Sequence, residues 1–164
     1  LMCEVDILSD GKLALPDAAF DYVDAVIVSL HSSFALPKSE MTKRVVSALT
    51  AHPKVRIFGH PTARLLGSRE GVEFDWGEIF AVCKERDIAL EINAAPQRLD
   101  VPDTVVFDAK KLGIRFSIDT DAHASESMTF MQYGVSVARR GWATKHDIVN
   151  GLEYNKFRTW LVKQ

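Results

Sequence analysis

The sequence contains little cysteine and no long apolar segment. Its two cysteines, Cys3 and Cys83, are far apart and form no C-x-x-C pair, so neither a disulfide framework nor a cysteine-ligated zinc site is expected. This usage is typical of a reducing compartment, and we expect a cytoplasmic protein. No apolar run approaches the ~20 residues that span a bilayer, so no association with a membrane is expected.

The sequence also lacks a large excess of either charge and several common catalytic motifs. The formal net charge of −2 argues against a strongly basic nucleic-acid footprint on the whole chain, although a local basic rim is compatible with it. The absence of G-x-S-x-G, G-x-G-x-x-G and P-loop motifs disfavours a serine hydrolase or a nucleotide-cofactor enzyme. A length of 164 residues suits one domain with a substantial core.

Short apolar runs alternate with stretches of helical periodicity along the chain. We expect a turn or hairpin at 9–15 and strands over 1–8, 22–30, 54–60, 87–94 and 114–123. Helices are expected over 39–52, 76–86, 103–113, 128–138 and 145–162. This order predicts an α/β fold with parallel strands, and the continuous apolar strands indicate a sheet covered on both faces. An open doubly wound sheet and a (β/α) barrel both fit the pattern.

Histidines and acids occur where a parallel α/β fold gathers functional groups, near the carboxyl ends of strands. The candidates are Glu4, His31, His60, Asp121 and His123. A single histidine after a strand is more often an ordinary loop residue than a ligand. Several of them, together with an Asp-x-His pair, are harder to explain in that way. Imidazole and carboxylate groups together suit zinc, manganese or iron, and such sets often bind more than one ion.

Six segments, in order along nearly the whole chain, resemble a known family. They are CEVDIL, SLHS, GHPTARLLG, LEINAAPQRLD, DTDAHA and YGVSVARRGW. They are similar to the carboxyl-terminal PHP (polymerase and histidinol phosphatase) domain of bacterial and archaeal family-X DNA polymerases. The resemblance implies a distorted barrel of seven βα units with a trinuclear metal cluster at its rim. It assigns metal ligation to Glu4, His31, His60, Asp121 and His123.

The sequence departs from the family pattern at its amino-terminal side. The family's opening H-x-H motif has no counterpart before Glu4, and the first two barrel strands have none either. We therefore expect residues 1–164 to form one PHP phosphoesterase domain that covers about the last five strands of the barrel. The chain is expected to be part of a longer protein, because a cluster with half its ligands would bind at most one or two ions weakly.

For an intact site, the resemblance implies metal-assisted hydrolysis of a phosphoester by up to three divalent ions, with Mn²⁺, Zn²⁺ and Fe²⁺ as the candidates. Asp121 and His123 are the candidate catalytic residues, and His123 is either a ligand or the proton donor to the leaving alkoxide. Further residues could support the ligands or contact substrate: Asn93, Asp119, Arg64, Arg98, Arg139 and Arg140. For each of these a structural role is at least as common, as a turn residue or a solvated charge.

The resemblance also suggests a substrate and partners. The expected activity is 3′–5′ exonuclease action or 3′-end cleaning on DNA during repair, with an upstream polymerase domain and the first part of the barrel as partners. Two alternatives remain open. One is a small-molecule phosphatase of the histidinol-phosphate type, and the other is a PHP scaffold without catalytic activity that stabilises a polymerase.

Overall fold

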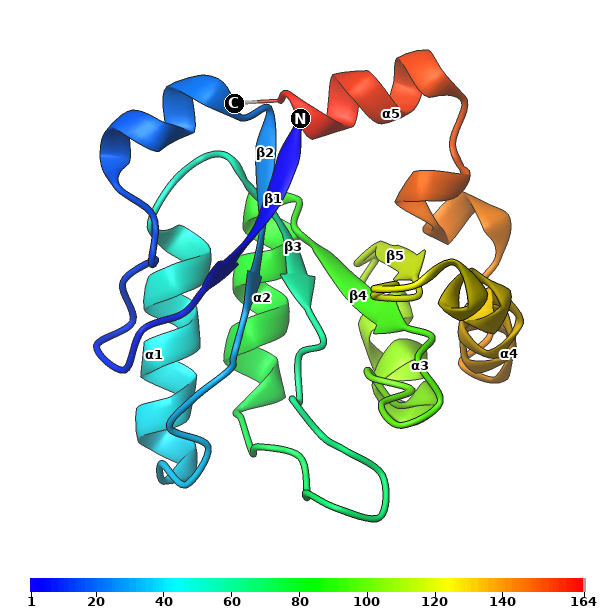
Figure 1. The fold of residues 1–164 in the computed structure, drawn as a ribbon, viewed down its shortest axis with the longest axis horizontal. Helices are drawn as coiled ribbons and strands as arrows, with labels where there is room; N and C mark the ends of the chain where they lie inside the picture. The colour runs from blue at the N-terminus through cyan, green and yellow to red at the C-terminus, as the bar shows by residue number, and fades with distance from the viewer. Residues whose placement is uncertain (164) are drawn as a thin grey trace.

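The computed structural model describes residues 1–163 as a five-stranded parallel sheet flanked by helices (Figure 1). The strands are β1 (Met2–Asp6), β2 (Ala25–Ser29), β3 (Val55–Gly59), β4 (Ala89–Asn93) and β5 (Phe116–Asp119). They pair in sequence order, and every neighbouring pair is parallel. This confirms the predicted parallel α/β fold. The unbroken order suits a barrel segment, because a doubly wound sheet reverses its order partway; the seven-unit barrel itself stays a prediction.

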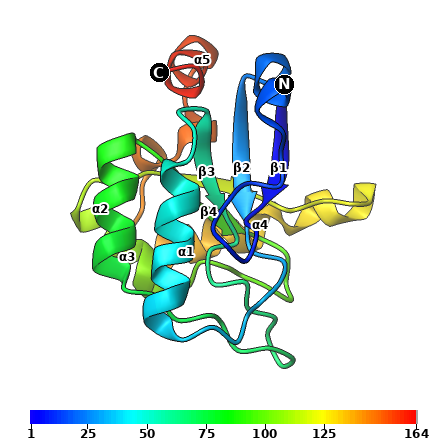
Figure 2. The same ribbon diagram turned by 90° about the vertical axis from the view of Figure 1, so that its left-hand side faces the viewer.

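Five α-helices accompany the sheet within the described residues. They are α1 (Lys38–Thr50), α2 (Trp76–Arg86), α3 (Asp103–Lys111), α4 (Met131–Arg140) and α5 (Tyr154–Leu161). Figure 2 shows α1, α2 and α3 on one face of the sheet, whereas α5 lies across the end where the strands begin. In residues 1–163, no helix combines the length and apolarity needed to cross a bilayer.

The face of the sheet that carries α1 to α4 is the main hydrophobic core. Val28, Phe58 and Leu90 point from successive strands into this core and are fully buried. They alternate with side chains on the opposite face, as the two-residue repeat of a strand requires. At the far end of the core α4 approaches closely at Gly134, where a Cβ atom would lie 2.6 Å from Ile118 Cγ2.

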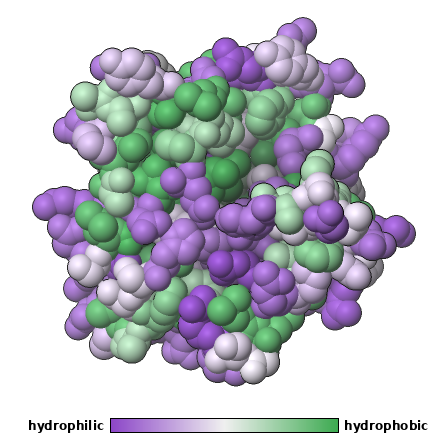
Figure 3. Space-filling model, in the orientation of Figure 1, coloured by the Kyte–Doolittle hydropathy of each residue, from purple (hydrophilic) through white to green (hydrophobic). Residues whose placement is uncertain are grey.

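The opposite face of the sheet, here called the inner face, is divided into two ends. Near the strand starts, small and apolar residues pack against α5 and form the amino-end cluster: Met2, Ala25, Ile27, Ile57, Ala89, Val149, Phe157, Trp160 and Leu161. Two residues further along β1 and β4 the same face becomes polar, at Glu4 and Glu91. Figure 3 shows this change as apolar surface below α5 and a hydrophilic zone across the middle of the molecule.

The predicted helix over 145–162 is wrong in its first half. The structure has two 3₁₀ turns there, η3 (Lys145–Asp147) and η4 (Val149–Gly151), and α5 starts only at Tyr154. Ile148 forms a parallel bridge with Phe116, and the Asn150 side chain accepts from the Ile118 N–H at 3.1 Å and donates to its carbonyl at 2.6 Å. The segment therefore pairs with the β5 edge, which a helix cannot do because its own backbone groups are bonded internally.

Other boundaries also differ from the predictions. The predicted strand over 114–123 is shorter, because β5 ends at Asp119 and a left-handed turn follows at Asp121. The predicted strand over 22–30 starts only at Ala25, because η1 (Asp17–Tyr22) is a 3₁₀ helix whose Phe20 is buried and stacks on His52 at 3.8 Å. The predicted helix over 128–138 is a 3₁₀ helix, η2 (Ser125–Phe130), followed by α4. The hairpin expected at 9–15 is confirmed by a Leu8 N–H to Lys12 carbonyl hydrogen bond of 2.8 Å.

Candidate metal and phosphoester site

Three of the predicted ligands converge at the carboxyl ends of β1, β2 and β3. Glu4 lies on the inner face of β1, His31 follows β2, and His60 follows β3. Glu4 Oε1 is 3.2 Å from His60 Nε2 and 3.7 Å from His31 Nε2, and the two Nε2 atoms are 3.2 Å apart. His60 is 2% exposed, whereas Glu4 and His31 are 39% and 38% exposed. The strands therefore bring one carboxylate and two imidazoles, far apart in sequence, into direct contact.

The spacing of these three atoms fits a common divalent ion. Ligand atoms at about 2.0–2.2 Å from a metal lie roughly 3–3.5 Å from one another when they occupy adjacent coordination positions. The three observed separations, 3.2, 3.7 and 3.2 Å, are close to this range. Two nitrogen ligands and one oxygen ligand suit zinc, manganese or iron. Glu4, His31 and His60 are thus a chemically coherent candidate set, and we call them the ligand trio.

The charge of the trio is set by Glu4. Its hydrogen bond with His60 lowers the pKa of the Glu4 carboxyl to about 2, and this outweighs its partial burial, which acts in the opposite direction. Nearby imidazole charge at His60 and His31 lowers the pKa further. Glu4 is therefore an anion at neutral pH, as a carboxylate ligand must be.

A second polar group occupies the same face on β4 and β5. Glu91 is buried and accepts a hydrogen bond from the His60 backbone N–H. The Asn93 amide nitrogen is 3.4 Å from Glu91 Oε2 and 3.4 Å from Asp121 Oδ2, so it can donate to both carboxyl groups. Burial, and then the charge of Asp119, raise the pKa of Glu91 well above its ordinary value. Burial also raises the pKa of Asp119.

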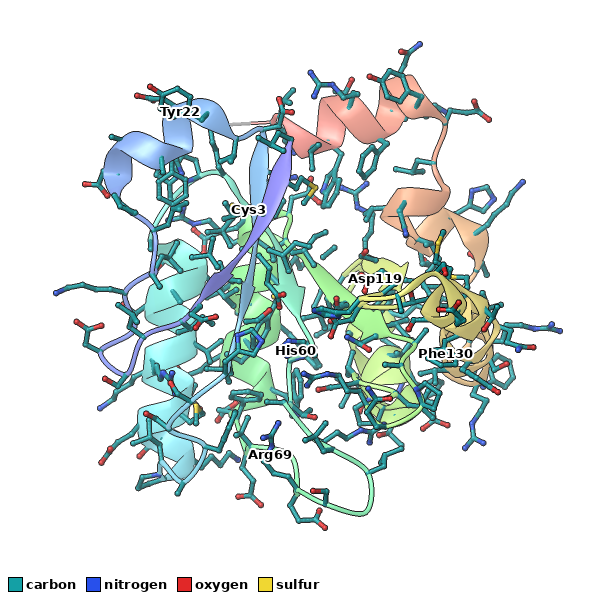
Figure 4. The ribbon with its side chains drawn as sticks, in the orientation of Figure 1. Cys3, Tyr22, His60, Arg69, Asp119 and Phe130 are labelled. Atoms are coloured by element: carbon teal, nitrogen blue, oxygen red, sulfur yellow. The ribbon has the colours of Figure 1, made fainter. Side chains whose placement is uncertain are left out.

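The two remaining predicted ligands do not join the trio in this structure. Among residues 1–163, the cluster whose ligand atoms all lie within 4.8 Å of one another consists of Glu4, His31 and His60. Asp121 adopts a left-handed backbone conformation just after β5, with φ of 49°. The Nδ1–H of His123 donates to the Asp121 carbonyl at 2.8 Å, and the His123 side chain is 86% exposed. In Figure 4, the labelled residues His60 and Asp119 mark the two sides of the site: His60 lies near the middle of the sheet and Asp119 lies on β5.

Asp121 is nevertheless linked to the trio by a chain of contacts. It runs from His60 through Glu91 to Asn93 and on to Asp121. Asn93 and Asp119 are in register on β4 and β5. Asn93 lies on β4, between the strand that precedes His60 and the strand that precedes Asp121, and Asp119 ends β5 two residues before Asp121. The supporting role of Asn93 and Asp119 stays a prediction.

The predicted arginine rim is divided between two locations. Arg98 Nε lies 3.6 Å from Asp121 Oδ2, and the Arg98 side chain is 15% exposed. Arg64 Nε donates to the Arg98 carbonyl at 2.9 Å, and its Nη2 donates to the Leu99 carbonyl. Arg98 is therefore next to a candidate ligand. Arg64 connects the loop after His60 to the loop after β4.

Arg139 and Arg140 lie at the carboxyl end of α4. Arg140 Nε binds Asp103 Oδ2 at 2.7 Å, at the start of α3. Within residues 1–163, neither arginine has a hydrogen bond or ion pair with the ligand trio. Their proposed contact with substrate stays a prediction.

The structure adds two acidic residues that the sequence interpretation missed. Asp6 Oδ1 is 2.6 Å from His31 Nδ1, and Glu91 contacts the His60 backbone. A signal for both was present in the sequence. Asp6 is two residues after Glu4, and Glu91 is two residues before Asn93, so each shares a strand face with a residue already chosen.

Two further residues hold the loops of the site. Arg44 of α1 is 4% exposed, and its guanidinium donates to the Leu8 carbonyl at 2.8 Å and to the Ser32 carbonyl at 3.0 Å. It thereby ties the loop after β1 to the loop that carries His31. Gly59 precedes His60, and a Cβ atom there would lie 2.2 Å from Ser29 Oγ. A larger residue fits at this point only if the side chains of Ser29 and Ile27 shift.

The chain is similar to several known proteins. The chain is 40% identical over 158 residues to the DNA polymerase/3′-5′ exonuclease PolX of Bacillus subtilis (strain 168), covering 96% of the chain and 28% of that protein. It is 26% identical over 168 residues to a probable phosphatase of Thermoanaerobacter sp. (strain X514), covering 65% of it. A probable phosphatase of Caldicellulosiruptor saccharolyticus is 29% identical over 129 residues. No model of a known protein family matches the chain.

These comparisons confirm the sequence resemblance. The chain matches a minor part of the polymerase and less than two thirds of each of the two phosphatases, with coverages of 28%, 65% and 51%. All three relatives have names that denote hydrolysis of phosphate esters.

Proposed function

The chain is homologous over nearly its whole length to a bacterial family-X DNA polymerase, and from this premise we propose that it is a metal-dependent phosphoesterase acting on DNA 3′ ends. The observation that carries the proposal is the ligand trio, in which three ligand atoms from three strands lie within 4.8 Å of one another. The 3′–5′ exonuclease named in the polymerase relative supports the DNA substrate. Processing of damaged 3′ ends in the cytoplasm during repair is the corresponding cellular role.

The proposal includes the architecture and partners of the intact protein. We place the chain in a distorted (β/α)7 barrel of the PHP type, as a single domain over residues 1–164. An upstream polymerase domain and the first barrel strands would complete it. Up to three divalent ions, Mn²⁺, Zn²⁺ or Fe²⁺, would bind at its rim, with Glu4, His31, His60, Asp121 and His123 as their ligands in this chain.

When bound, divalent ions supply Lewis acidity toward the phosphoester and lower the pKa of nearby water. The side chains have distinct tasks around them. Glu4, His31 and His60 would hold an ion through one carboxylate oxygen and two Nε2 atoms. His123, whose Nδ1–H is held by the Asp121 carbonyl, presents an exposed Nε2 that can ligate or, when protonated, deliver a proton to the leaving alkoxide. Arg98 is placed beside Asp121, where its guanidinium can bind a phosphate oxygen.

A second candidate function is a small-molecule phosphatase. The specific observation in its favour is the group of probable phosphatases among the relatives, which are 26% and 29% identical to the chain in two cases. They are less similar than the polymerase, which is 40% identical. DNA 3′-end hydrolysis is therefore the primary proposal.

The test uses the intact protein, Mn²⁺ and a 5′-labelled single-stranded oligonucleotide. We expect a ladder of products shortened from the 3′ end that requires Mn²⁺, is lost in His31→Ala and is kept in His146→Ala, a variant of an exposed histidine outside the site. Release of inorganic phosphate from a small phosphomonoester without a ladder would replace the proposal with the phosphatase. Bound metal with neither activity would identify a non-catalytic scaffold.

A further inference from the structure

Asp6 makes a short contact with one member of the ligand trio. Its Oδ1 atom lies 2.6 Å from His31 Nδ1. The strand pairing explains this contact, because Asp6 is in register with Ser29 on β2 and His31 is two residues beyond Ser29 on the same chain. Asp6 is also two residues after Glu4, so both carboxylates leave β1 on the inner face. One carboxylate therefore faces the metal-binding nitrogen of His31, and the other faces its second nitrogen.

The chemistry of the contact determines where the ring proton lies. An ionised aspartate only accepts hydrogen bonds, so the proton of the neutral ring lies on His31 Nδ1. The lone pair is then on Nε2, the atom 3.7 Å from Glu4 Oε1 and 3.2 Å from His60 Nε2. Only this tautomer leaves Nε2 free to bind a cation.

The other imidazole of the trio is held by different means. His60 is 2% exposed, so packing fixes its ring, and its backbone N–H is bound by Glu91. Within residues 1–163 its Nδ1 atom has no hydrogen-bond partner. His31, by contrast, is 38% exposed, and surrounding side chains cannot fix its orientation to the same degree. A polar anchor is needed at His31, and Asp6 supplies it.

We propose that Asp6 is a positioning residue that holds His31 in the Nδ1–H tautomer, with Nε2 directed at the site shared with Glu4 and His60. Asp6 acts through His31 and does not itself bind the metal, since its Oδ1 is engaged at the opposite side of the ring. This inference rests on the proposed metal site, but it does not depend on the identity of the substrate.

The experiment compares Asp6→Ala and Asp6→Asn with Asp10→Ala in the intact protein. Asp10 is a matched control, because it is an exposed aspartate nearby whose contacts are with Lys12. The ¹⁵N shifts of the His31 ring are measured in metal-free protein at fixed pH, with His31→Ala used for assignment. The affinity for Zn²⁺ alone is measured by calorimetry, and urea unfolding verifies that each variant is folded.

We expect the wild-type ring and the Asp10→Ala ring to carry the proton on Nδ1. In Asp6→Ala the Nε2–H form should become the main tautomer and Zn²⁺ affinity should fall about 10–100-fold. Asp6→Asn keeps an acceptor oxygen, so it should show an intermediate loss. Unchanged shifts and affinity in Asp6→Ala would overturn the proposal.

A second pattern would also overturn it. If Asp6 were itself a ligand, Asp6→Asn would lose as much affinity as Asp6→Ala while the metal-free His31 tautomer stayed the same in both variants. These measurements use no nucleic acid. A protein that binds Zn²⁺ as expected but does not cleave DNA would therefore refute the proposed function and leave the role of Asp6 standing.

Discussion

The two ends of the inner face are built on the same strands but have opposite character. At the amino end, residues such as Ala25 and Ile57 are buried beneath Trp160 and Leu161 of α5. At the carboxyl end, the same face presents Glu4 and His31, both more than a third exposed. The change occurs over a single two-residue step along a strand, for example from Met2 to Glu4 on β1 and from Ala89 to Glu91 on β4.

This difference separates stability from chemistry along one sheet. Burial of apolar area contributes about 25 cal/mol per Å², so the end covered by α5 is the one that stabilises the sheet. At the polar end, Glu4 and His31 stay more than a third exposed, which leaves their ligand atoms accessible to a cation. Substitutions at the two ends should therefore have different consequences, and the predictions below run from the largest to the smallest expected effect on folding.

Trp160→Ala should cause the largest loss of stability. Trp160 is 4% exposed, and its indole N–H donates to the Asp87 carbonyl at 3.0 Å. Truncation of a buried tryptophan lowers the free energy of unfolding by about 3–5 kcal/mol, which urea denaturation would measure. Trp142→Ala is the control, because Trp142 is 72% exposed and should change stability by no more than about 0.5 kcal/mol. Equal effects would show that α5 does not stabilise this end.

Asp87→Asn should cause the next largest loss of stability. Asp87 binds Arg115 Nη2 at 2.6 Å and lies 3.6 Å from Nη2 of Arg56, a guanidinium that is 3% exposed. Removing the carboxylate leaves Arg56 without its counter-ion and should cost about 1–3 kcal/mol. Asp108→Asn is the control, because its pair with Lys111 is exposed on both sides and should contribute little.

The loss of stability caused by Asp87→Asn should also depend on pH. Burial opposes ionisation of Asp87, but the hydrogen bond and charge of Arg115, with the charges of Arg56 and Lys163, outweigh it and lower the pKa below 3.8. A depressed carboxylate pKa stabilises the fold above the ordinary value, and this contribution is lost as pH falls through the folded-state pKa. The difference between wild type and Asp87→Asn should therefore shrink below about pH 3.8. A difference that is constant from pH 7 to pH 3 would contradict this assignment.

Gly59→Ala tests the boundary between the two ends. The added Cβ would lie 2.2 Å from Ser29 Oγ and 2.9 Å from Ile27 Cγ2, so the Ser29 and Ile27 side chains must shift, at a cost of about 1–3 kcal/mol. Adding Ser29→Ala should recover part of the loss because it removes the nearer atom. Gly151→Ala is the control, since its closest neighbour would be at 3.6 Å. A neutral Gly59→Ala variant would refute the close approach.

His31→Ala should affect folding least and metal binding most. The side chain is 38% exposed, so the free energy of unfolding should change by less than about 1 kcal/mol. Loss of one trio ligand should weaken the affinity for Zn²⁺ by at least roughly tenfold, or about 1.4 kcal/mol. Zn²⁺ should then raise the melting temperature of the wild type and of His146→Ala more than that of His31→Ala. An equal rise in all three proteins would place the ion elsewhere.

The sequence predicted the regular elements well where local signals agree. The α2 helix has the predicted bounds, Trp76–Arg86, and Asp75 caps it by accepting hydrogen bonds from the Gly77 and Glu78 N–H groups. The parallel order followed from the alternation of strands and helices. The prediction was wrong for the start of the final helix, because Asn150 and Ile148 pair with the β5 edge, a contact between segments about thirty residues apart in the chain.

Part of the candidate site follows from strand-end position, and part depends on loop conformation. Strand-end position identified Glu4, His31 and His60, which the structure places together. The same rule also selected Asp121 and His123, which lie outside this trio after a left-handed turn at Asp121, where His123 Nδ1–H donates to the Asp121 carbonyl. The ligand role of all five residues stays a prediction. Turn conformation after a strand depends on contacts with neighbouring loops, which periodicity does not report.

By itself, the sequence determined the α/β class, the parallel strands and the residue types available for metal binding. These properties follow from the spacing of apolar residues and from the side chains at strand ends, which are local features of the chain. Only the tertiary structure decided which ligands meet, that Asp6 lies behind His31, and that Glu91 holds the backbone of His60. These contacts join residues 25 and 31 positions apart, and their distances depend on strand register, which forms only when the whole sheet packs.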